Sequence, residues 1–408
     1  MDNHTVPIVL DPAGTNIQGE IARIREQGPV TLVELPGGVR AWSITNAAVL
    51  KEILSGSTVS KDPRKHWPAF QNGEIPEDWE LANWINTPSM FIAYGADHRR
   101  LRKVVSKGFT PRSTAELEPR IQEIVQELVK GLEATPAGQV VDLREEFAYP
   151  LPIRVIGELL GVPEDLSEPL RVCVDSVFDT GVSKDEAVAT YTEMIGLLQT
   201  LVAFRRENPG QDMTSTLIRA ADDPETDFTE AELVGTLYLT VNAGHETTVS
   251  LLDHAIHLLL THPGHRAAVS EGTLGWTEVI EEVLRFESPA AHVPLRYAVD
   301  DFELGGVAIA AGDPILVCYA GASRDPQVHG PTTDVFDPTR ATKEHMAFGY
   351  GVHHCLGEPL ARLEAQIALP EIFTRFPDMM LAPGQEIGAV PGFISNGHRR
   401  LPVLLSGK

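Results

Sequence analysis

Near its C-terminal end the chain reads Phe348-Gly349-Tyr350-Gly351-Val352-His353-His354-Cys355-Leu356-Gly357-Glu358-Pro359-Leu360-Ala361-Arg362. It places a single cysteine in a glycine-rich loop. The residues after the loop are good helix formers with apolar spacing, and Pro359 suits a first helical turn. Cys355 therefore precedes a helix N-terminus, where free N–H groups and the helix dipole favour a thiolate, the form that ligates metals. On this loop alone, a buried structural cysteine remains the alternative.

The spacing of the loop resembles the haem-binding loop of the cytochrome P-450 family. The matching residues are Phe348, Gly349, Gly351, His353, Cys355, Gly357, Ala361 and Arg362. The resemblance implies that Cys355 is the axial ligand of the iron of haem b (iron protoporphyrin IX). It also implies cofactor contacts from Phe348, Gly349, His353 and Gly357. A thiolate ligand pushes electron density toward O–O cleavage.

Composition limits the classes of protein that this chain can belong to. Of its 408 residues, 43% are hydrophobic and 22% are charged, which is typical of a soluble globular protein with a large core. The net charge of -24 argues against nucleic acid or an anionic membrane surface as the main partner. The three cysteines are widely spaced, and the N-terminus shows neither a secretory signal nor an apolar anchor. We therefore expect a cytoplasmic protein that is not attached to a membrane.

A long helix is predicted in the second half of the chain. Thr229-x-x-Glu232 is a capping-box signature, and helical character continues to His262-Pro263. At about 1.5 Å per residue, such a helix is roughly 50 Å long and crosses the molecule. Its middle is mostly apolar, but polar residues from Asn242 to Thr248 argue against a lipid-exposed span and indicate a buried functional centre.

The centre of this helix reads Ala243-Gly244-His245-Glu246-Thr247-Thr248 and resembles the oxygen-activation motif of the family, Ala/Gly-Gly-x-Asp/Glu-Thr. Glycine and threonine weaken a helix, so we expect an interruption and a groove for dioxygen and water. By resemblance, Ala243 contacts the haem, Thr247 donates a hydrogen bond during oxygen activation, and Glu246 supplies protons. An isolated Glu-Thr pair would otherwise be a capping or packing pair. A zinc-protease motif fails because Val249 stands where a second histidine is required.

Basic residues at three places resemble the family's contacts to the haem propionates. His98 and Arg102 are four residues apart in a predicted helix and reproduce a His-x-x-x-Arg clamp. Arg296 follows His292-Val293-Pro294-Leu295, which resembles the strand that passes over the haem, and His353 adds a further contact. A solvated basic helix face is the alternative for His98 and Arg102.

The region from His98 to Ala115 contains no acidic residue, although the chain as a whole is strongly acidic. Its basic residues are Arg99, Arg100, Arg102, Lys103, Lys107 and Arg112. We expect those that do not contact propionates to form a positive patch that docks an acidic electron-transfer partner. The resemblance identifies the partners as ferredoxin and ferredoxin reductase.

Other segments predict a framework and a pocket. Glu282, Arg285 and Arg340 match a buried ion network of the family, although the first two alone would also suit a surface helical pair. Residues 30–35 and 39–44 predict a hairpin, and the aromatic-rich residues 66–96 predict a pocket lid. The predicted pocket residues suit a large apolar substrate: they are Met90, Phe91, Phe178, Val293, Phe393 and Ile394, with Asn242 as a polar anchor.

These motifs occur in the family's order from His98 to Arg362. We therefore expect one domain over residues 1–408, mainly α with small β-sheets, with haem between a long central helix and the cysteine-loop helix. The expected activity is a monooxygenase that inserts one atom of O2 into an apolar steroid, polyketide or similar molecule, acting as a monomer. A peroxide-driven peroxygenase and a non-catalytic haem sensor are the alternatives, and the pair Glu246 and Thr247 counts against both.

Overall fold

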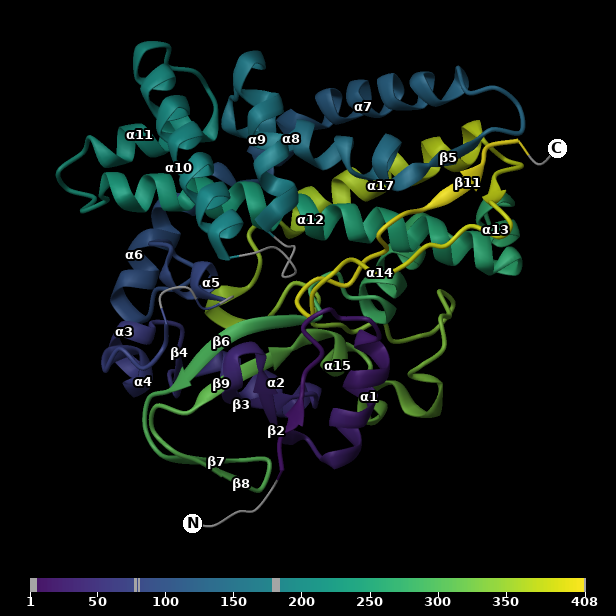
Figure 1. Cartoon of the computed structure of the whole chain (residues 1–408). Coiled ribbons are helices and arrows are strands. Elements are labelled where there is room, and N and C mark those ends of the chain that lie inside the picture. The colour runs from purple at the N-terminus through teal and green to yellow at the C-terminus, as the bar shows by residue number, and fades with distance from the viewer. Residues whose placement is uncertain (1–5, 77–78, 80, 178–183, 407–408) are drawn as a thin grey trace.

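The computed structural model describes residues 6–76, 79, 81–177 and 184–406, and most of them are helical (Figure 1). The longer helices are α1 (Ile17–Gln27), α2 (Ala47–Ser55), α6 (Gly95–Val105), α7 (Pro111–Glu133), α8 (Pro150–Leu160), α9 (Glu164–Val177), α10 (Lys184–Glu207), α11 (Met213–Ala221), α12 (Glu230–Thr261), α13 (Pro263–Ser270), α14 (Trp276–Phe286) and α17 (Glu358–Arg375). The short helices are α3 (Pro63–His66), α4 (Pro68–Gln71), α5 (Ala82–Asn86), α15 (Tyr319–Ser323) and α16 (Pro326–His329). None of the described helices has both the length and the apolar content that crossing a bilayer requires.

The strands form small sheets, as predicted, and the largest has six strands in the order β1-β2-β3-β9-β6-β4. The strands of this sheet are β1 (Ile8–Val9), β2 (Val30–Leu35), β3 (Val39–Ile44), β4 (Val59–Ser60), β6 (His292–Ala298) and β9 (Pro314–Cys318). The predicted hairpin is confirmed, because β2 and β3 pair antiparallel from Val30 opposite Ile44 to Leu35 opposite Val39. The smaller sheets contain β5 (Val140–Asp142), β10 (Met380–Leu381) and β11 (Pro402–Leu404), and β7 (Phe302–Leu304) with β8 (Val307–Ile309).

The long central helix is α12, and its N-terminus is the predicted capping box. Thr229 Oγ1 accepts from the backbone N–H of Glu232 at 3.2 Å, and the Glu232 carboxylate accepts from the backbone N–H of Thr229 at 2.9 Å. These bonds satisfy N–H groups that a helix start leaves free. The helix packs against α8, α10, α14 and α17, which buries most of its side chains. In Figure 1 it runs through the helical part of the molecule, and the six-stranded sheet lies on one side of that part.

The interruption expected in this helix does not occur. The helix is continuous from Glu230 to Thr261, through Gly244 and both threonines. The Thr247 hydroxyl donates to the Ala243 carbonyl at 2.7 Å, so the side chain bonds the backbone without displacing the helical hydrogen bonds. Helical packing on both sides of this stretch outweighs the weak propensity of its residues.

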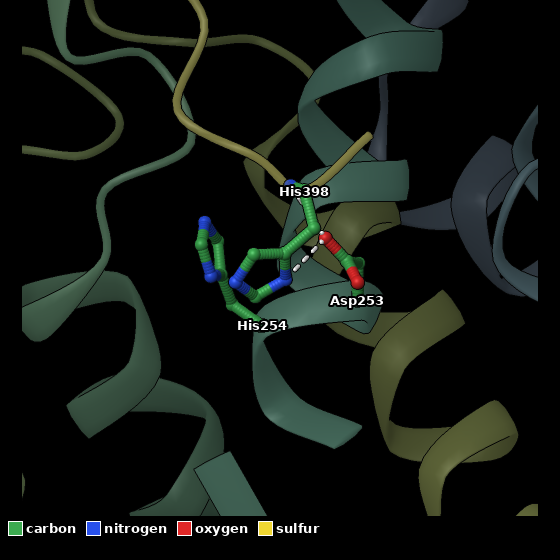
Figure 2. Close-up of side chains that lie close together, drawn as sticks. All are labelled: Asp253, His254 and His398. Carbon is green, nitrogen blue, oxygen red and sulfur yellow. Dashed lines mark hydrogen bonds and ion pairs between the residues drawn. The ribbon is translucent and has the colours of Figure 1, made fainter. Parts of the chain in front are cut away.

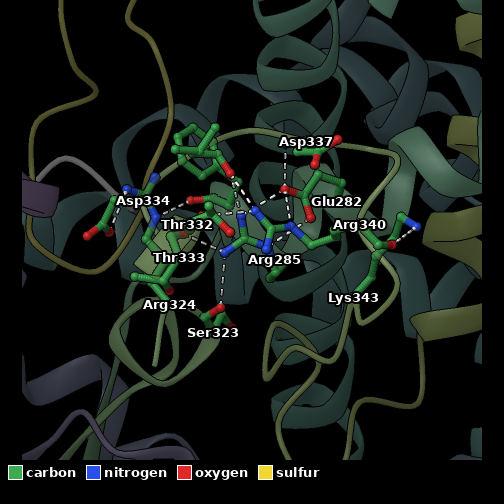
Figure 3. Close-up of polar contacts among 12 residues, drawn as sticks. Glu282, Arg285, Ser323, Arg324, Thr332, Thr333, Asp334, Asp337, Arg340 and Lys343 are labelled. Carbon is green, nitrogen blue, oxygen red and sulfur yellow. Dashed lines mark hydrogen bonds and ion pairs between the residues drawn. The ribbon is translucent and has the colours of Figure 1, made fainter. Parts of the chain in front are cut away.

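The predicted ion network is confirmed and lies between α14 and the segment that leads to the cysteine loop (Figure 3). Glu282 accepts from Arg285 Nε and Nη2, both at 2.8 Å, and from Arg340 Nε at 2.9 Å. The side chains of Glu282 and Arg285 are fully buried. Arg285 also donates to the backbone carbonyls of Thr333 at 2.8 Å and Val335 at 3.0 Å, so its charge is matched and its donors are used.

Candidate functional site

A large cavity lies between α12 and the cysteine loop. The space between protein atoms in it, including its mouth, is about 1620 Å³. The predicted site residues that line it are His98, Arg102, Ala243, Thr247, Arg296, Phe348, His353, Cys355 and Gly357. The predicted substrate residues that line it are Met90, Phe91, Val293 and Ile394. Segments far apart in the sequence therefore meet around one space.

Several predicted site residues are not in the cavity wall. Asn242 donates to the Tyr238 carbonyl at 2.7 Å within α12 and contacts the Met194 sulfur of α10, so it is directed away from the cavity. Phe393 is fully buried and packs against the His292 ring. Gly349 and Glu246 are not among the residues that line the cavity, and Glu246 pairs with Arg144 instead. Phe178 lies outside the described residues.

The cysteine loop has the sharp backbone turns that its glycines predict. Gly349 and Gly351 have φ of 71° and 70°, values that residues with a Cβ rarely adopt. A Cβ on Gly351 would lie 2.0 Å from the Leu54 carbonyl oxygen, so this position also excludes a side chain by contact. The Cys355 backbone N–H donates to the Phe348 carbonyl at 2.9 Å, which closes the loop before α17 begins at Glu358.

The Cys355 thiol is accessible from the cavity but is enclosed by protein on its other sides. This burial raises its pKa, while the backbone N–H of Gly357 and then that of Glu358 act in the opposite direction. The sequence predicted a helix terminus that favours a thiolate. That terminus is present, but desolvation outweighs it, so the thiolate needs a bound cation for full stabilisation.

One wall of the cavity carries five basic side chains, which we call the cation wall: Lys61, His98, Arg102, Arg296 and His353. Lys61 and Arg296 are fully enclosed, and the rings of His98 and His353 are 4.1 Å apart. Arg102 Nη2 donates to the His354 carbonyl at 2.7 Å. Among the described residues, no carboxylate forms an ion pair with any member of the cation wall.

The cation wall provides a test of whether these residues fit a haem. The atoms Nε and Nη1 of Arg296 and Nε2 of His98 are buried without a hydrogen-bond partner among the described residues. Buried cations without partners are costly, so the chain requires an anion here. The two propionate carboxylates of haem b meet this requirement, and Cys355 on the same cavity supplies the thiolate ligand. The residues therefore fit the group.

The pKa shifts of the cation wall also indicate that its basic side chains lack a negatively charged partner. Burial, followed by the charges of Arg102 and Arg296, lowers the pKa of His98 to about 4. Burial and Arg296 also lower the pKa of His353 well below its usual value. Burial and Arg296 lower the pKa of Lys61 in the same way. Each shift disfavours positive charge, which a bound carboxylate would reverse.

Thr247 and Glu246 lie side by side in sequence but in different environments. Thr247 lines the cavity, whereas Glu246 accepts from Arg144 Nη2 at 2.9 and 3.1 Å on another face of α12. Both members of that ion pair are largely buried. Burial raises the pKa of Glu246, although Arg144 opposes the shift. A carboxyl of this kind holds a proton more readily than an exposed one.

Lys61 and Arg144 belong to the site but were not predicted from the sequence. Lys61 Nζ lies 3.4 Å from the centre of the Phe91 ring, and it reaches the cavity because it follows β4, which pairs with β6 next to Arg296. Its position in the basic stretch Lys61-Asp62-Pro63-Arg64-Lys65 gave no sign of burial. Arg144 follows Leu143 and precedes Glu145 and Glu146, a pattern that equally suits an exposed turn.

The fold and the cavity define a mainly helical protein whose central cavity offers a cysteine thiol and unpaired basic groups to a bound cofactor. The cytochrome P450 family model matches residues 276–387. The 2-hydroxy-5-methyl-1-naphthoate 7-hydroxylase of Streptomyces carzinostaticus is 44% identical over 98% of this chain and 98% of its own. The 6-deoxyerythronolide B hydroxylase of Saccharopolyspora erythraea is 36% identical over 95% of each chain. The structure of CYP154A1 from Streptomyces coelicolor A3(2) has 49% identity and a TM-score of 0.93, covering 98% of this chain and all of that one.

These similarities extend over nearly the whole chain, so the protein belongs to the cytochrome P450 family. It is a cytochrome P450 monooxygenase, and its cofactor is haem b. The predicted family, fold class, enzyme class and cofactor are confirmed.

Proposed function

We propose that Cys355 ligates the haem iron and that the cation wall holds the two propionates. The observation that carries this proposal is a cavity with a thiol on one side and five basic groups, none paired with a carboxylate, on another. Phe348 and Gly357 line the same cavity beside the sulfur. When bound, the haem supplies the activation of dioxygen and the insertion of one oxygen atom into the substrate.

We further propose that Thr247 and Glu246 deliver protons to the cavity. The Thr247 hydroxyl lines the cavity and donates to the Ala243 carbonyl, so it can exchange that bond for one to water. The Glu246 carboxyl, next to Thr247 in the sequence, would be the source of the proton. Arg144 holds this carboxyl away from the cavity. Passing a proton forward therefore requires Glu246 to release Arg144 or to act through water.

Replacing Thr247 tests this assignment. In Thr247→Ala we expect substrate affinity within about twofold of the wild type, because one methyl-sized change leaves the apolar wall intact. The product formed per NADPH consumed should fall by about tenfold or more, because general acid catalysis typically contributes 10²–10⁴-fold. Thr261→Ala, at the end of the same helix and outside the cavity lining, is the matched control. Full coupling in Thr247→Ala would contradict the role.

The proposed substrate is an apolar natural product, such as a steroid, a polyketide or an aromatic molecule of similar size. Met90, Phe91, Val293 and Ile394 give the cavity apolar walls. The related enzymes act on a naphthoate and on 6-deoxyerythronolide B, as their names state. Together these observations favour a rigid, largely apolar ring system.

We propose ferredoxin and ferredoxin reductase as the source of electrons. In the predicted positive patch, Arg100 pairs with Glu232 at 2.6 Å and Arg112 pairs with Glu116 at 2.8 Å, so these two charges are used within the chain. Arg99, Lys103 and Lys107 are exposed on or just after α6, whose Arg102 reaches the cysteine loop. The docking surface therefore consists of Arg99, Lys103 and Lys107 rather than of the whole basic stretch.

Charge reversal tests the docking surface. Arg99→Glu with Lys103→Glu should slow electron transfer from a ferredoxin by about tenfold at low salt, and the difference should disappear as ionic strength rises. Arg112→Glu, whose native charge is already paired, is the matched control. Equal rates for both variants at all salt concentrations would contradict the proposal.

The remaining parts of the proposal concern the state of the protein: one haem domain over residues 1–408, acting as a cytoplasmic monomer. The test of the whole function is product formation with NADPH, ferredoxin and reductase across a library of apolar natural products. Product with the redox chain supports the monooxygenase assignment to this substrate class. Product with hydrogen peroxide alone would favour a peroxygenase, and binding without product from any source would favour a sensor.

A further inference from the structure

A second group of titratable side chains lies outside the wall of the cavity (Figure 2). Asp253 and His254 are on α12, and His398 is on the C-terminal segment that crosses that helix. The ring of His257, one turn further along α12, lies 4.5 Å from the ring of His398. Neither the haem nor the proposed proton delivery uses these residues.

The three side chains converge as a set of metal ligands. Asp253, His254 and His398 each offer one ligand atom, and the three atoms lie within 4.8 Å of one another. His398 Nδ1 is 3.0 Å from Asp253 Oδ2, a contact that is an ion pair without the alignment of a hydrogen bond. Zinc bonds to nitrogen and oxygen are about 2.0–2.2 Å, which separates tetrahedral ligand atoms by roughly 3.3–3.6 Å. The three ligand atoms would therefore have to approach one another on binding by on the order of 1 Å at most.

His254 has the tautomer that a metal ligand needs. Its Nε2 lies 3.0 Å from the Asn396 carbonyl oxygen, which can only accept. Nε2 therefore carries the ring proton, and Nδ1 keeps a lone pair. Metal-binding histidines commonly donate the other ring N–H to a backbone carbonyl in this way, which fixes the orientation of the ring.

Asp253 is a buried carboxylate with an unused oxygen. Its side chain is fully buried, and Oδ1 has no hydrogen-bond partner among the described residues. Oδ2 accepts from the His398 backbone N–H at 2.9 Å. Although burial opposes ionisation, the contact with His398 lowers the pKa of Asp253. Arg144, which pairs with Glu246, and His254 attract this carboxylate from further away, and His398 is the one ion-pair partner that it contacts among the described residues.

We propose that Asp253, His254 and His398 bind a divalent ion of the Zn²⁺ class, with a water molecule as the fourth ligand. Two imidazoles and one carboxylate suit a borderline ion such as Zn²⁺ better than Mg²⁺ or Ca²⁺. The His398 side chain is 17% exposed, which gives the ion access from solvent. The ion would replace the attraction between the protonated His398 ring and the Asp253 carboxylate.

Binding would connect α12 to the segment that carries part of the cavity wall. Ala389 and His398 bridge antiparallel, and the Val390 N–H donates to the Gly397 carbonyl at 3.0 Å, so residues 389–398 form a turn of chain. Ile394 in this turn lines the cavity. The metal would fix the base of the turn to the helix and stabilise the folded protein by an amount that grows with the ratio of free ion concentration to the dissociation constant.

The test is a calorimetric titration of the haem-loaded enzyme with ZnCl₂ after removal of bound ions by a chelator. We expect one equivalent of Zn²⁺ to bind and the thermal midpoint to rise. In Asp253→Asn and in His398→Ala the dissociation constant should increase at least tenfold, the usual consequence of losing a ligand or its support. His265→Ala, on α13, is the matched control and should bind as the wild type does.

An absence of Zn²⁺ binding by the wild type, or equal binding by Asp253→Asn and His398→Ala, would overturn the proposal. The reduced carbon monoxide spectrum of each variant shows whether it is folded and loaded with haem. Should Asp253→Asn fail to fold, His398→Ala and His254→Ala decide the matter. Anomalous diffraction at the zinc edge should give a peak between the three side chains, and a peak elsewhere would count against the site.

Discussion

Two buried clusters of basic side chains in this molecule differ in how far the chain itself supplies their partners. In the network around Glu282, Arg285 and Arg340 share one carboxylate and direct their remaining donors to backbone carbonyls (Figure 3). In the cation wall, Arg296 and His98 have buried nitrogen atoms with no partner among the described residues. The first cluster is complete within the chain, and the second is complete only with a bound anion.

This difference separates structural from ligand-binding charges without reference to any relative. A matched buried network costs little to maintain and holds its elements together, whereas an unmatched one destabilises the empty chain. Removing a charge should therefore have opposite effects on the haem-free protein in the two places.

The largest effect is expected at the matched network. Glu282→Ala leaves Arg285 and Arg340 buried without their carboxylate, which should lower the free energy of unfolding by about 3–5 kcal/mol. Urea unfolding followed by circular dichroism measures the change. Glu278→Ala, an exposed position on the same helix, should change stability by less than about 0.5 kcal/mol. If Glu282→Ala lowers the free energy of unfolding by less than about 1 kcal/mol, the Glu282 network does not differ from the cation wall in the way proposed.

A smaller effect of opposite sign is expected at Arg296. Arg296→Met removes a buried unpaired charge, so the haem-free chain should become more stable by about 1 kcal/mol. The haem-loaded protein should lose a charge-assisted contact, and haem dissociation should accelerate by about 10- to 100-fold. Unfolding of the haem-free chain and haem transfer to apomyoglobin measure the two effects. If Arg296→Met releases haem faster but its haem-free chain is less stable than the wild type, Arg296 is a structural arginine rather than an unpaired charge.

Lys61 tests whether the cation wall binds an anion at a residue that no sequence motif indicated. In Lys61→Met haem dissociation should accelerate by about threefold to tenfold, less than for Arg296→Met, because Lys61 Nζ also rests on the Phe91 ring. Lys65→Met is the matched control, since Lys65 is half-exposed and pairs with Asp97. If both lysine variants release haem at the wild-type rate, Lys61 is not part of the anion site.

The smallest effect is a pH dependence from His98. Its pKa is lowered from 6.5 to about 4 by burial and by the neighbouring arginines. The unfolded chain therefore binds this proton first as the pH falls, and the haem-free protein should lose stability between pH 6.5 and about 4. His98→Gln should reduce this loss by about 1 kcal/mol. An unchanged slope in His98→Gln would contradict the lowered pKa.

The sequence predicted those features that depend on local spacing. The helix after the cysteine, the capping box at Thr229 and the hairpin of β2 and β3 each follow from residue types at fixed offsets, and all three are present. The Glu282 network was also predicted, because its motif repeats a family pattern. Local rules fix these elements because their deciding contacts are close in sequence.

Features that depend on packing in three dimensions were predicted less well. Asn242 and Thr247 are five residues apart on one helix, but only Thr247 reaches the cavity, since helix rotation decides which face a residue occupies. The pKa of Cys355 depends on burial that no sequence motif reports. Lys61 and Arg144 are buried by segments that pair with them from elsewhere in the chain.

The most direct test of the central claim compares haem b with its dimethyl ester, in which both propionates are uncharged. The haem-free chain should bind the ester on the order of a hundredfold more weakly than haem b, because the cation wall would stay unmatched. In Arg296→Met the difference between the two should shrink. Equal affinity of the wild-type chain for haem b and for the ester would contradict the account.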